Sequence, residues 1–539
     1  MTALVCLHYS AFALDNGVAR TPPMGWNSWN KFGNPGCTNT SVNETVVRGI
    51  ADAMAAPGGL AASGYNYVIV DDCWMASQRD ATGNLQADPI RFPSGMQALA
   101  AYVHAKGLKF GLYESPTQAT CQLKPGSYGH EAGDAATFSA WGVDYLKYDW
   151  CQTGTTQSPQ MWADNPGLTE GQLGQLLFTR MSNELQKQSR PIGYSLSSCC
   201  STGALNFPSW AGAVANLWRT SGDISDSWSS MIGNYQAAVS LQPAAGPGKW
   251  NDPDMLEVGN GGMTATEYRT HFGLWAMLAA PLIAGNDLRS MDSTTATTLS
   301  NRDVIAVDQD PLGIPATIVS STAVGSTGNT VVLSRPLANG DRAVALLNTS
   351  SASMTISTTL QAIGLPLGSA TLKNLYTGVS SGTVGPIGAT VPSHGLVMYR
   401  VTSTTPPVAG ATELVSKASG RCLDLSGGST TSGTKLIISD CTGGATQQFV
   451  STSINQLQLG SNPSMCVDIP IGAVATTAVQ ISTCDLSKHQ QFDRIYDGKY
   501  KGVLSNMCLD VSGGGTSPNN TPVIAYGCSG NSNQIWSRR

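Results

Sequence analysis

The 539-residue sequence predicts three folded regions: a (β/α)₈ barrel at 14–312, an antiparallel β-sandwich at 313–401 and an all-β unit at 413–539. Three observations carry this prediction. Short apolar runs alternate with amphipathic stretches in the first region, turn-rich alternating runs fill the second, and a repeat of about 43 residues occupies the third. A chain of this length is too long for one hydrophobic core, so several domains are expected.

The first region contains eight candidate strands separated by helical patterns. We expect strands over 24–29, 67–72, 108–114, 144–149, 192–197, 216–222, 249–255 and 282–287, and helices that include 45–55, 95–105, 171–188 and 264–279. Eight strands alternating with helices over about 290 residues have the pattern and size of a (β/α)₈ TIM barrel. A doubly wound open sheet is the alternative, but no glycine-rich phosphate loop follows the first strand.

The second region changes to short alternating strands, for example at 330–334, 343–347 and 396–401. Gly, Ser and Asn turns separate them, and helical patterns nearly vanish, as is typical of a small antiparallel sandwich. Residues 402–412, with Pro406 and Pro407, have the composition of a linker.

The third region repeats one motif three times, which predicts a pseudo-threefold unit. Each copy has Cys-x-Asp, a second Cys 18 to 20 residues later, and then Gln-x-Phe or Gln-x-Trp. This register resembles the ricin-type β-trefoil lectin, in which the last aromatic packs in the core of each lobe. The resemblance implies that Asp424, Asp468 and Asp510 bind sugar, and the alternative is that they stabilise the turn after each first Cys.

Composition narrows the classes of partner and the compartment. The net charge is −5 with 12% charged residues and no long basic run, so nothing favours nucleic acid or an anionic membrane. No apolar stretch approaches the roughly 20 residues that span a bilayer. Residues 1–13 end in Ala11-Phe12-Ala13 like a signal peptide, although the basic n-region is missing. The regular pairs of Cys beyond position 420 predict disulfides, rather than free buried thiols, and thus a secreted, extracellular protein.

Acidic residues gather where the barrel strands are expected to end, at the face where barrel enzymes carry reactive groups. They are Asp71, Asp72, Asp149, Asp223, Asp252 and Asp254. Hydrolysis of a glycosidic bond needs two carboxylates. Any single Asp has the competing interpretation of a helix N-cap or an ion-pair partner. No His or Glu cluster at ligand spacing accompanies them, so we expect no metal and no cofactor.

Five segments decide between these interpretations, and they lie at 14–29, 71–74, 146–151, 219–224 and 250–255. In order and spacing they resemble glycoside hydrolase family 27, the α-galactosidase (melibiase) and α-N-acetylgalactosaminidase group. The resemblance covers residues 14 to about 400. It implies a retaining glycosidase that releases terminal α-D-galactose from a galactose-containing oligo- or polysaccharide.

Carried over position by position, the resemblance makes Asp149 the nucleophile and Asp223 the acid/base of a double displacement. Lys147 lies two residues before Asp149, on the same face of the strand, where a cation is expected to keep Asp149 ionised and to bind a sugar hydroxyl. Arg219 is expected to help bind substrate.

The resemblance also implies the remaining contacts to the sugar. Asp71 and Asp72 match the acids that grip O4 and O6 of galactose, and Trp29 and Tyr113 match the aromatic wall. Asp254 and Ser197 complete the expected substrate-binding set. The implied disulfides are Cys37–Cys73 and Cys121–Cys151 in the barrel, and the repeat adds Cys422–Cys441, Cys466–Cys484 and Cys508–Cys528.

One segment departs from the family pattern. Residues 194–201 lack the acidic residue that reads the substituent at C2, so Ser197 or Ser198 has room for a 2-acetamido group. This leaves α-N-acetylgalactosaminidase specificity open, and Cys199–Cys200 has the alternatives of a vicinal disulfide and free thiols. At C5, Asp72 favours galactose over β-L-arabinopyranose. A dextranase-like relative and a catalytically inactive carbohydrate-binding protein are further alternatives, the last disfavoured because both carboxylates are retained.

Overall fold

The structure, a computed structural model, describes residues 14–33, 36–38, 42–198, 202–326 and 328–539. The expected signal peptide at 1–13 and the pair Cys199–Cys200 lie outside these residues. The chain forms two compact units, one running to Asp223 and including Gly248–Asp252, the other comprising Ile224–Pro247 and Pro253–Arg539. Among the residues so described, no helix is both long and apolar enough to cross a membrane.

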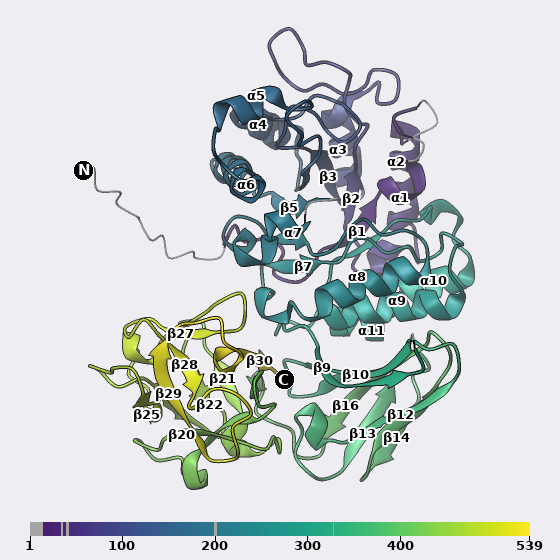
Figure 1. The fold of residues 1–539 in the computed structure, drawn as a ribbon. Coiled ribbons are helices and arrows are strands. Elements are labelled where there is room, and N and C mark those ends of the chain that lie inside the picture. The colour runs from purple at the N-terminus through teal and green to yellow at the C-terminus, as the bar shows by residue number, and fades with distance from the viewer. Residues whose placement is uncertain (1–13, 34–35, 39–41, 199–201, 327) are drawn as a thin grey trace, which may run out of the picture. The chain divides into compact units, whose positions relative to one another are not determined.

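Eight parallel-type strands form one curled sheet, which confirms the barrel class (Figure 1). The first seven pair in chain order as parallel neighbours. The strands are β1 (Met24–Asn27), β2 (Tyr67–Val70), β3 (Lys109–Glu114), β4 (Tyr145–Asp149), β5 (Gly193–Ser197), β6 (Leu217–Arg219), β7 (Trp250–Asp252) and β8 (Leu282–Ala284). Strands β1, β2, β6, β7 and β8 end two or three residues earlier than expected.

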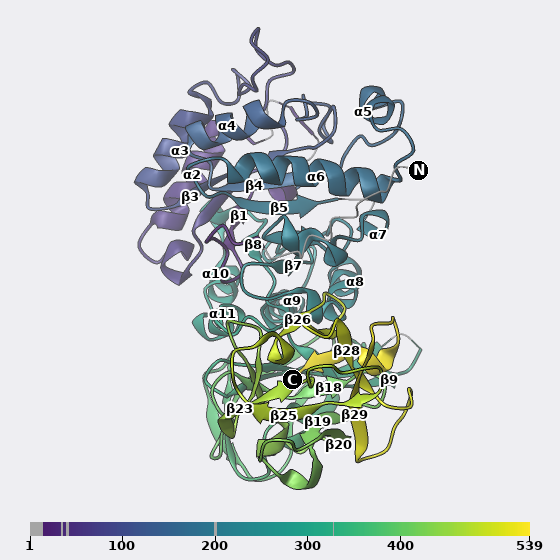
Figure 2. The same ribbon diagram turned by 90° about the vertical axis from the view of Figure 1, so that its left-hand side faces the viewer.

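The helices of the first unit lie outside these strands, and α3, α4 and α6 are seen there in Figure 2. They are α1 (Trp29–Phe32), α2 (Glu44–Ala55), α3 (Gly95–Ala105), α4 (Glu131–Trp141), α5 (Pro159–Asp164), α6 (Glu170–Gln186) and α7 (Thr202–Leu205). Helix α6 shows why they form. Thr169 and Gln172 make a reciprocal capping box, and Leu173, Leu177 and Met181 form a buried stripe at helical spacing.

The second unit begins with helices and continues into the sandwich. The helices are α8 (Trp228–Val239), α9 (Ala265–Leu278), α10 (Ser293–Leu299) and α11 (Arg302–Asp308). The strands are β9 (Thr317–Val324), β10 (Gly328–Pro336), β11 (Arg342–Asn348), β12 (Met354–Thr358), β13 (Ala370–Asn374), β14 (Ser380–Thr383), β15 (Ile387–Val391) and β16 (Leu396–Ser403). Six of them form one antiparallel sheet, and β12 and β15 form the other. Val344, Ile356 and Val391 share the core between the sheets, which confirms the sandwich.

The C-terminal region is entirely β and carries the threefold repeat in its core. Its strands are β17 (Ala411–Thr412), β18 (Leu414–Ser416), β19 (Cys422–Leu425), β20 (Leu436–Ser439), β21 (Phe449–Ser451), β22 (Leu457–Leu459), β23 (Asn462–Asp468), β24 (Thr477–Ala478), β25 (Gln480–Thr483), β26 (Phe492–Arg494), β27 (Tyr500–Gly502), β28 (Met507–Val511), β29 (Thr521–Gly527) and β30 (Trp536–Arg538). The motif aromatics Phe449, Phe492 and Trp536 belong to one buried cluster.

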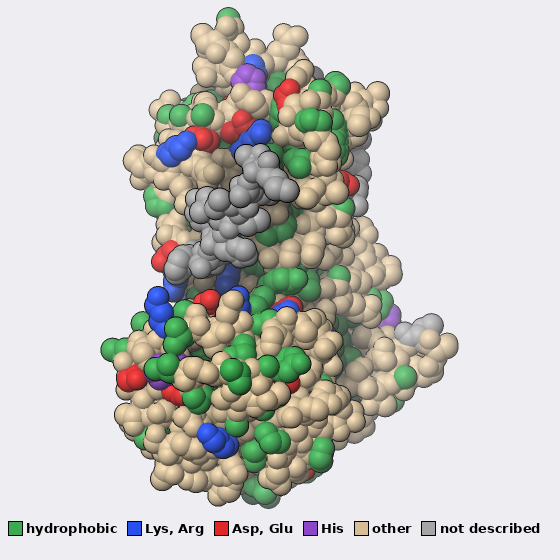
Figure 3. Space-filling view, turned by 60° about the vertical axis from the view of Figure 1, so that its left-hand side comes forward, with side chains coloured by type: hydrophobic (Ala, Val, Ile, Leu, Met, Phe, Trp, Pro, Cys, Tyr) green, Lys and Arg blue, Asp and Glu red, His purple; other side chains and the backbone are tan. Residues whose placement is uncertain are grey.

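The expected linker at 402–412 is shorter in the structure. Strand β16 runs to Ser403, and Ala411 and Thr412 already pair with Val450 and Phe449 in β21. The proline-containing stretch between these strands is what remains of it. Most of the surface is neutral, as the tan atoms of Figure 3 show for one face, in keeping with the low charged fraction.

Candidate active site

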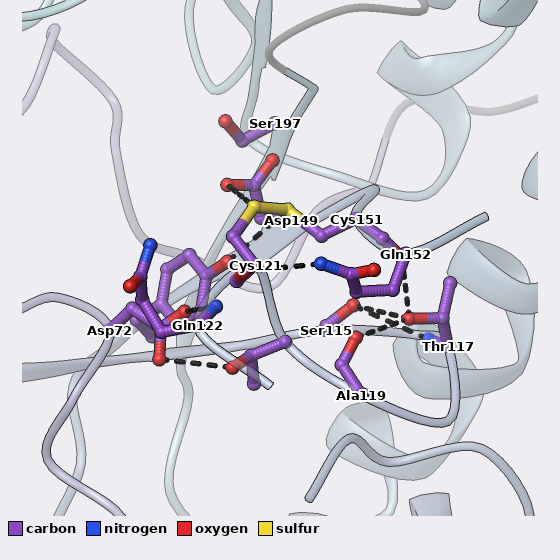
Figure 4. Close-up of a disulfide and its surroundings, with 12 residues drawn as sticks. Asp72, Ser115, Thr117, Ala119, Cys121, Gln122, Asp149, Cys151, Gln152 and Ser197 are labelled. Atoms are coloured by element: carbon purple, nitrogen blue, oxygen red, sulfur yellow. Dashed lines mark hydrogen bonds between the residues drawn. A yellow bond between two sulfur atoms is a disulfide. The ribbon is translucent and has the colours of Figure 1, made fainter. Parts of the chain in front are cut away.

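Asp149 ends strand β4 and is almost completely buried, at 7% exposed. Its Oδ1 has no hydrogen-bond partner among the residues that the structure describes. Its Oδ2 lies 3.9 Å from Sγ of Cys121, in the disulfide drawn in Figure 4. A buried carboxylate oxygen without a donor lowers the stability of the fold. A nucleophile, however, requires an oxygen that is not occupied by a hydrogen bond.

Asp223 follows strand β6 and is held by Arg219. The guanidinium Nη2 of Arg219 donates to Oδ1 of Asp223 at 2.9 Å, and the Arg219 side chain is 2% exposed against 54% for Asp223. Burial by itself raises the pKa of Asp223, but the charges of Arg219 and Lys147 outweigh it and hold the pKa below its usual value. The ligand-free site therefore favours ionised Asp223.

Burial raises the pKa of Asp149 to about 6, and the negative charge of Asp223 adds to this. Lys147 lowers the pKa of Asp149, as expected, but burial outweighs it, so Asp149 is ionised only above about pH 6. The pKa values of the two carboxyl groups are thus shifted in opposite directions, and the proton is held on Asp149 rather than on Asp223.

The ammonium of Lys147 bonds to Asp71. Nζ donates to Oδ2 of Asp71 at 2.8 Å, and Nδ2 of Asn27 donates to the same oxygen at 2.7 Å. Lys147 also lies 5.3 Å from the ring centroid of Tyr113. Strands β1, β3 and β4, together with the residue that follows β2, thereby place these side chains together. Asn27 was not predicted as a site residue.

Asp72 is bound by the loop that follows β3. Its Oδ1 accepts from the Cys73 amide at 2.7 Å and from Oγ1 of Thr120 at 3.0 Å. Its Oδ2 accepts from the amide of Gln122 at 2.9 Å. Burial raises the pKa of Asp72 to about 6, against these hydrogen bonds. The sequence carries no signal for Thr120 or Gln122, because both act from an irregular loop.

The other expected contacts lie in the same unit. Trp29 begins α1, and its ring covers Gly33, where an added Cβ would stand 2.4 Å from Cε3 of the indole. Tyr113 is 1% exposed, and its hydroxyl lies 3.5 Å from Sγ of Cys151. Ser197 ends β5, and its Oγ accepts from Nη1 of Arg219 at 3.4 Å.

Asp254 belongs to the second unit and has a left-handed backbone, with φ of 82°. Its Oδ2 accepts from the amide of Ile224 at 2.8 Å, and its carbonyl accepts from Nε1 of Trp275 at 2.7 Å. Ile224 is the next residue after Asp223. Asp254, expected to bind substrate, thus bonds to the backbone of the segment that follows Asp223.

The five implied disulfides are formed: Cys37–Cys73, Cys121–Cys151, Cys422–Cys441, Cys466–Cys484 and Cys508–Cys528. Two groups of potential metal ligands occur in the described part of the chain, around Asp72 and around Asp149. Both consist otherwise of disulfide sulfurs, whereas metals bind the thiolate.

Each motif Asp of the trefoil accepts a hydrogen bond from the motif Gln of its own copy. Nε2 of Gln447, Gln490 and Gln534 donates to Asp424, Asp468 and Asp510, respectively. Asp510 has a second amide donor, Asn533, at 2.9 Å. These bonds join each Asp to the end of its own copy, so each Asp has a structural partner, and a sugar-binding role has to be argued from additional groups.

Comparison with known proteins covers all three regions. The family described as Alpha galactosidase A matches residues 21–310, its C-terminal β-sandwich domain matches 327–401, and the ricin-type β-trefoil lectin domain matches 410–536. An α-galactosidase of Cyamopsis tetragonoloba is 44% identical over 400 residues, which are 73% of this chain and 90% of that protein.

Solved structures agree. α-Galactosidase I of Mortierella vinacea aligns with a TM-score of 0.65 at 35% identity, over 73% of this chain and 99% of that one. The α-galactosidase of Saccharomyces cerevisiae, solved with raffinose, aligns with a TM-score of 0.65 at 31% identity, over 72% and 99%. The chain belongs to the α-galactosidase family, glycoside hydrolase family 27.

Proposed function

We propose that this protein hydrolyses terminal α-D-galactosides with retention, with Asp149 as nucleophile and Asp223 as acid/base. The observation that carries the proposal is the buried Asp149 carboxylate, whose Oδ1 has no donor among the described residues, in the electrostatic field of the Arg219–Asp223 pair. Relatives named α-galactosidase, for example the 44% identical protein of Cyamopsis tetragonoloba, support the substrate.

The first step requires Asp149 ionised and Asp223 protonated, so the proton has to move from Asp149 to Asp223 when substrate binds. A carboxylate oxygen of Asp149 then attacks the anomeric carbon while Asp223 gives its proton to the departing glycosidic oxygen. The products are a galactosyl ester on Asp149 and the free alcohol. In the second step, Asp223 takes a proton from water, whose oxygen attacks the anomeric carbon and releases galactose with net retention. Arg219 stabilises the ionised Asp223 that acts as base in this step. A retaining pair has its carboxyl groups about 5–5.5 Å apart.

The binding groups distinguish parts of the sugar by their chemistry. Asp71 and Lys147 form a buried ion pair, which presents both an acceptor and a donor to neighbouring hydroxyls. Ser197 lies beside the guanidinium of Arg219, the position that we assign to the substituent at C2. We propose galactose as the preferred sugar over N-acetylgalactosamine and β-L-arabinopyranose.

A panel of four p-nitrophenyl glycosides tests this proposal: α-D-galactoside, β-L-arabinopyranoside, α-N-acetylgalactosaminide and α-D-glucoside, with Asp149→Ala beside the wild type. We expect the α-galactoside to dominate and the substitution to abolish its hydrolysis. A dominant rate on another glycoside would keep the mechanism and overturn the specificity. Equal activity of Asp149→Ala would overturn the nucleophile.

For the trefoil, we propose that the third copy binds a neutral sugar of the polymeric substrate. The residue paired with the first Cys of each copy is Ser439, Ser482 or Tyr526. Tyr526 is an aromatic that is 46% exposed, and Asp510, oriented by two amides, lies two pairs further along the same ladder, opposite Ile524. An aromatic face with a few fixed polar groups suits a sugar ring.

Tyr526→Ala, with Ser482→Ala as the matched variant of another copy, tests this assignment without truncating the chain. We expect Tyr526→Ala to weaken retention on immobilised galactan or galactomannan and to lower hydrolysis of the polymer. Hydrolysis of the p-nitrophenyl α-galactoside should stay unchanged, because tethering raises only the local concentration of polymer. Equal losses on both substrates would contradict the tethering role.

The five disulfides also support secretion to an oxidising compartment.

A further inference from the structure

The loop between β3 and α4 contains a tight hairpin turn over residues 120–124. The amide of Thr120 donates to the carbonyl of Lys124 at 2.9 Å, and the amide of Leu123 donates to the carbonyl of Thr120 at 3.0 Å. In three-residue hairpin loops the last residue adopts the left-handed conformation and is normally glycine. Here it is Leu123, with φ of 58°.

The other members of this turn are fixed to the active site. Thr120 and the amide of Gln122 bond to the carboxylate of Asp72, and the disulfide sulfur of Cys121 lies 3.9 Å from Asp149 (Figure 4). Gln152 donates from Nε2 to the carbonyl of Cys121 at 3.2 Å, which adds a second link beside the disulfide. The turn therefore has no freedom to move Leu123 away from the site.

Side-chain exposure differs sharply between this turn and the acids that it contacts. Asp72 is 1% exposed and Asp149 is 7% exposed, whereas the Leu123 side chain is 70% exposed. The galactosyl unit must reach the buried acids, so a side chain at the exposed rim meets the part of the substrate that stays outside. The turn that bonds to Asp72 thus also presents an exposed apolar side chain.

We propose that Leu123 is the apolar contact for the leaving group, the sugar or aglycone beyond the scissile oxygen. Sugar rings and aryl groups both present apolar faces, and Leu123 offers the matching surface. This inference rests on the proposed role of Asp149 and assigns a specificity-determining residue to the same site. Leu123 touches no reacting atom, so its effect depends on the leaving group.

The test compares leaving groups in the full-length protein. Leu123→Asn keeps nearly the same side-chain size and suits the left-handed backbone, but it removes the apolar surface. Leu123→Met keeps the apolar surface. Leu486→Asn in the trefoil is the matched control, because Leu486 has φ of 64° and is 69% exposed. The substrates are α-galactosyl fluoride, which has no aglycone, p-nitrophenyl α-galactoside and an α-galactosyl disaccharide.

We expect Leu123→Asn to lower kcat/KM roughly 3- to 30-fold on the disaccharide and the aryl galactoside, and to leave the fluoride and inhibition by galactose unchanged. Leu123→Met should retain most of the activity, and Leu486→Asn all of it. Equal losses on all three substrates, or no loss on any, would overturn the assignment to the leaving group. A wild-type protein inactive on α-galactosyl fluoride would instead overturn the proposed function itself.

Discussion

Asp149 in the barrel and Asp510 in the trefoil have nearly the same burial, 7% and 6% exposed, and burial raises the pKa of both. Their partners differ. Asp510 accepts from Asn533 on one oxygen and from Gln534 on the other, whereas Oδ1 of Asp149 accepts from no described residue. Burial alone therefore does not mark a reactive acid. A missing donor is not sufficient either, because Oε2 of Glu114 and Oδ1 of Asp308 are also buried without a partner among the described residues. Asp149 differs from them because the charges of Lys147, Arg219 and Asp223 act on it.

The largest expected difference between the two acids is in catalysis. Asp149→Asn removes the attacking charge with little change in shape, so kcat on p-nitrophenyl α-galactoside should fall at least about 1,000-fold. Asp510→Asn should leave kcat on this small substrate within about twofold, since the trefoil acts only on polymer binding. Comparable losses of kcat in the two variants would contradict a catalytic role that only Asp149 has.

The charges around the two acids provide the next test. Arg219 and Lys147 act on Asp149 and Asp223, while the shift of Asp510 is caused by burial and opposed only by neutral amides. Arg219→Gln removes a cation that lowers the pKa of both catalytic acids. Both limbs of the pH profile of kcat/KM should therefore move to higher pH, with a loss of roughly 10- to 100-fold at the optimum.

Arg190→Gln is the control for this variant, because Arg190 pairs with Asp144 and not with either catalytic acid. Its pH profile should match that of the wild type. An Arg219→Gln profile with unmoved limbs would show that the guanidinium only binds substrate.

Stability separates the two acids in a third way. The pKa of Asp149 is about 6 in the folded protein against 3.8 for an unperturbed Asp, so the folded state binds the extra proton between these values. The contribution of Asp149 to stability is consequently greatest below about pH 4 and declines as pH rises towards 6. Asp149→Asn removes this penalty and should raise the free energy of unfolding at pH 7 by roughly 2–3 kcal/mol.

The gain should vanish near pH 4, where Asp149 is protonated in both states, and urea unfolding at the two pH values measures it. Asp510→Asn should show the opposite sign at pH 7, because it places an amide where two amide donors already point. A stabilised Asp510→Asn would mean that its partners do not stabilise the charge.

Much of this arrangement follows from patterns in the chain, and the rest depends on loop geometry. Asp149 was predictable because a barrel strand ends there, and the alternation rule placed Lys147 on the same face. The rule could not show that Lys147 would bond to Asp71, since that contact joins strand β4 to the residue after β2. It also could not show the hydrogen bond from Thr120 to Asp72, because the sequence of an irregular loop has no periodic pattern.

The trefoil copies show the same limit on a smaller scale. The repeat placed Asp and Gln in register, but their direct hydrogen bond required both β-strand geometry and the short turn before the Gln. The residue before the Gln adds to this bond in two copies: Asn533 donates to Asp510, and Nδ1 of His489 lies 2.7 Å from Oδ2 of Asp468. The first copy has Thr446 at this position. The identity of that neighbour is visible in the sequence, whereas its contact is not.

The smallest expected effect concerns the Gln that orients each trefoil acid. Gln534→Ala leaves Oδ2 of Asp510 without its 2.8 Å donor and the carbonyl of Gly527 without its 2.9 Å donor, so the free energy of unfolding should fall by about 1–3 kcal/mol. Gln447→Ala should cost a similar amount, because Gln447 makes the equivalent bonds to Asp424 and to the carbonyl of Asp440. Thermal unfolding measures the structural role of each Gln, and retention on immobilised polymer measures its effect on sugar binding. We expect both variants to lose stability. Only Gln534→Ala should also lose retention, because only its copy has Tyr526 in the ladder that carries Asp510.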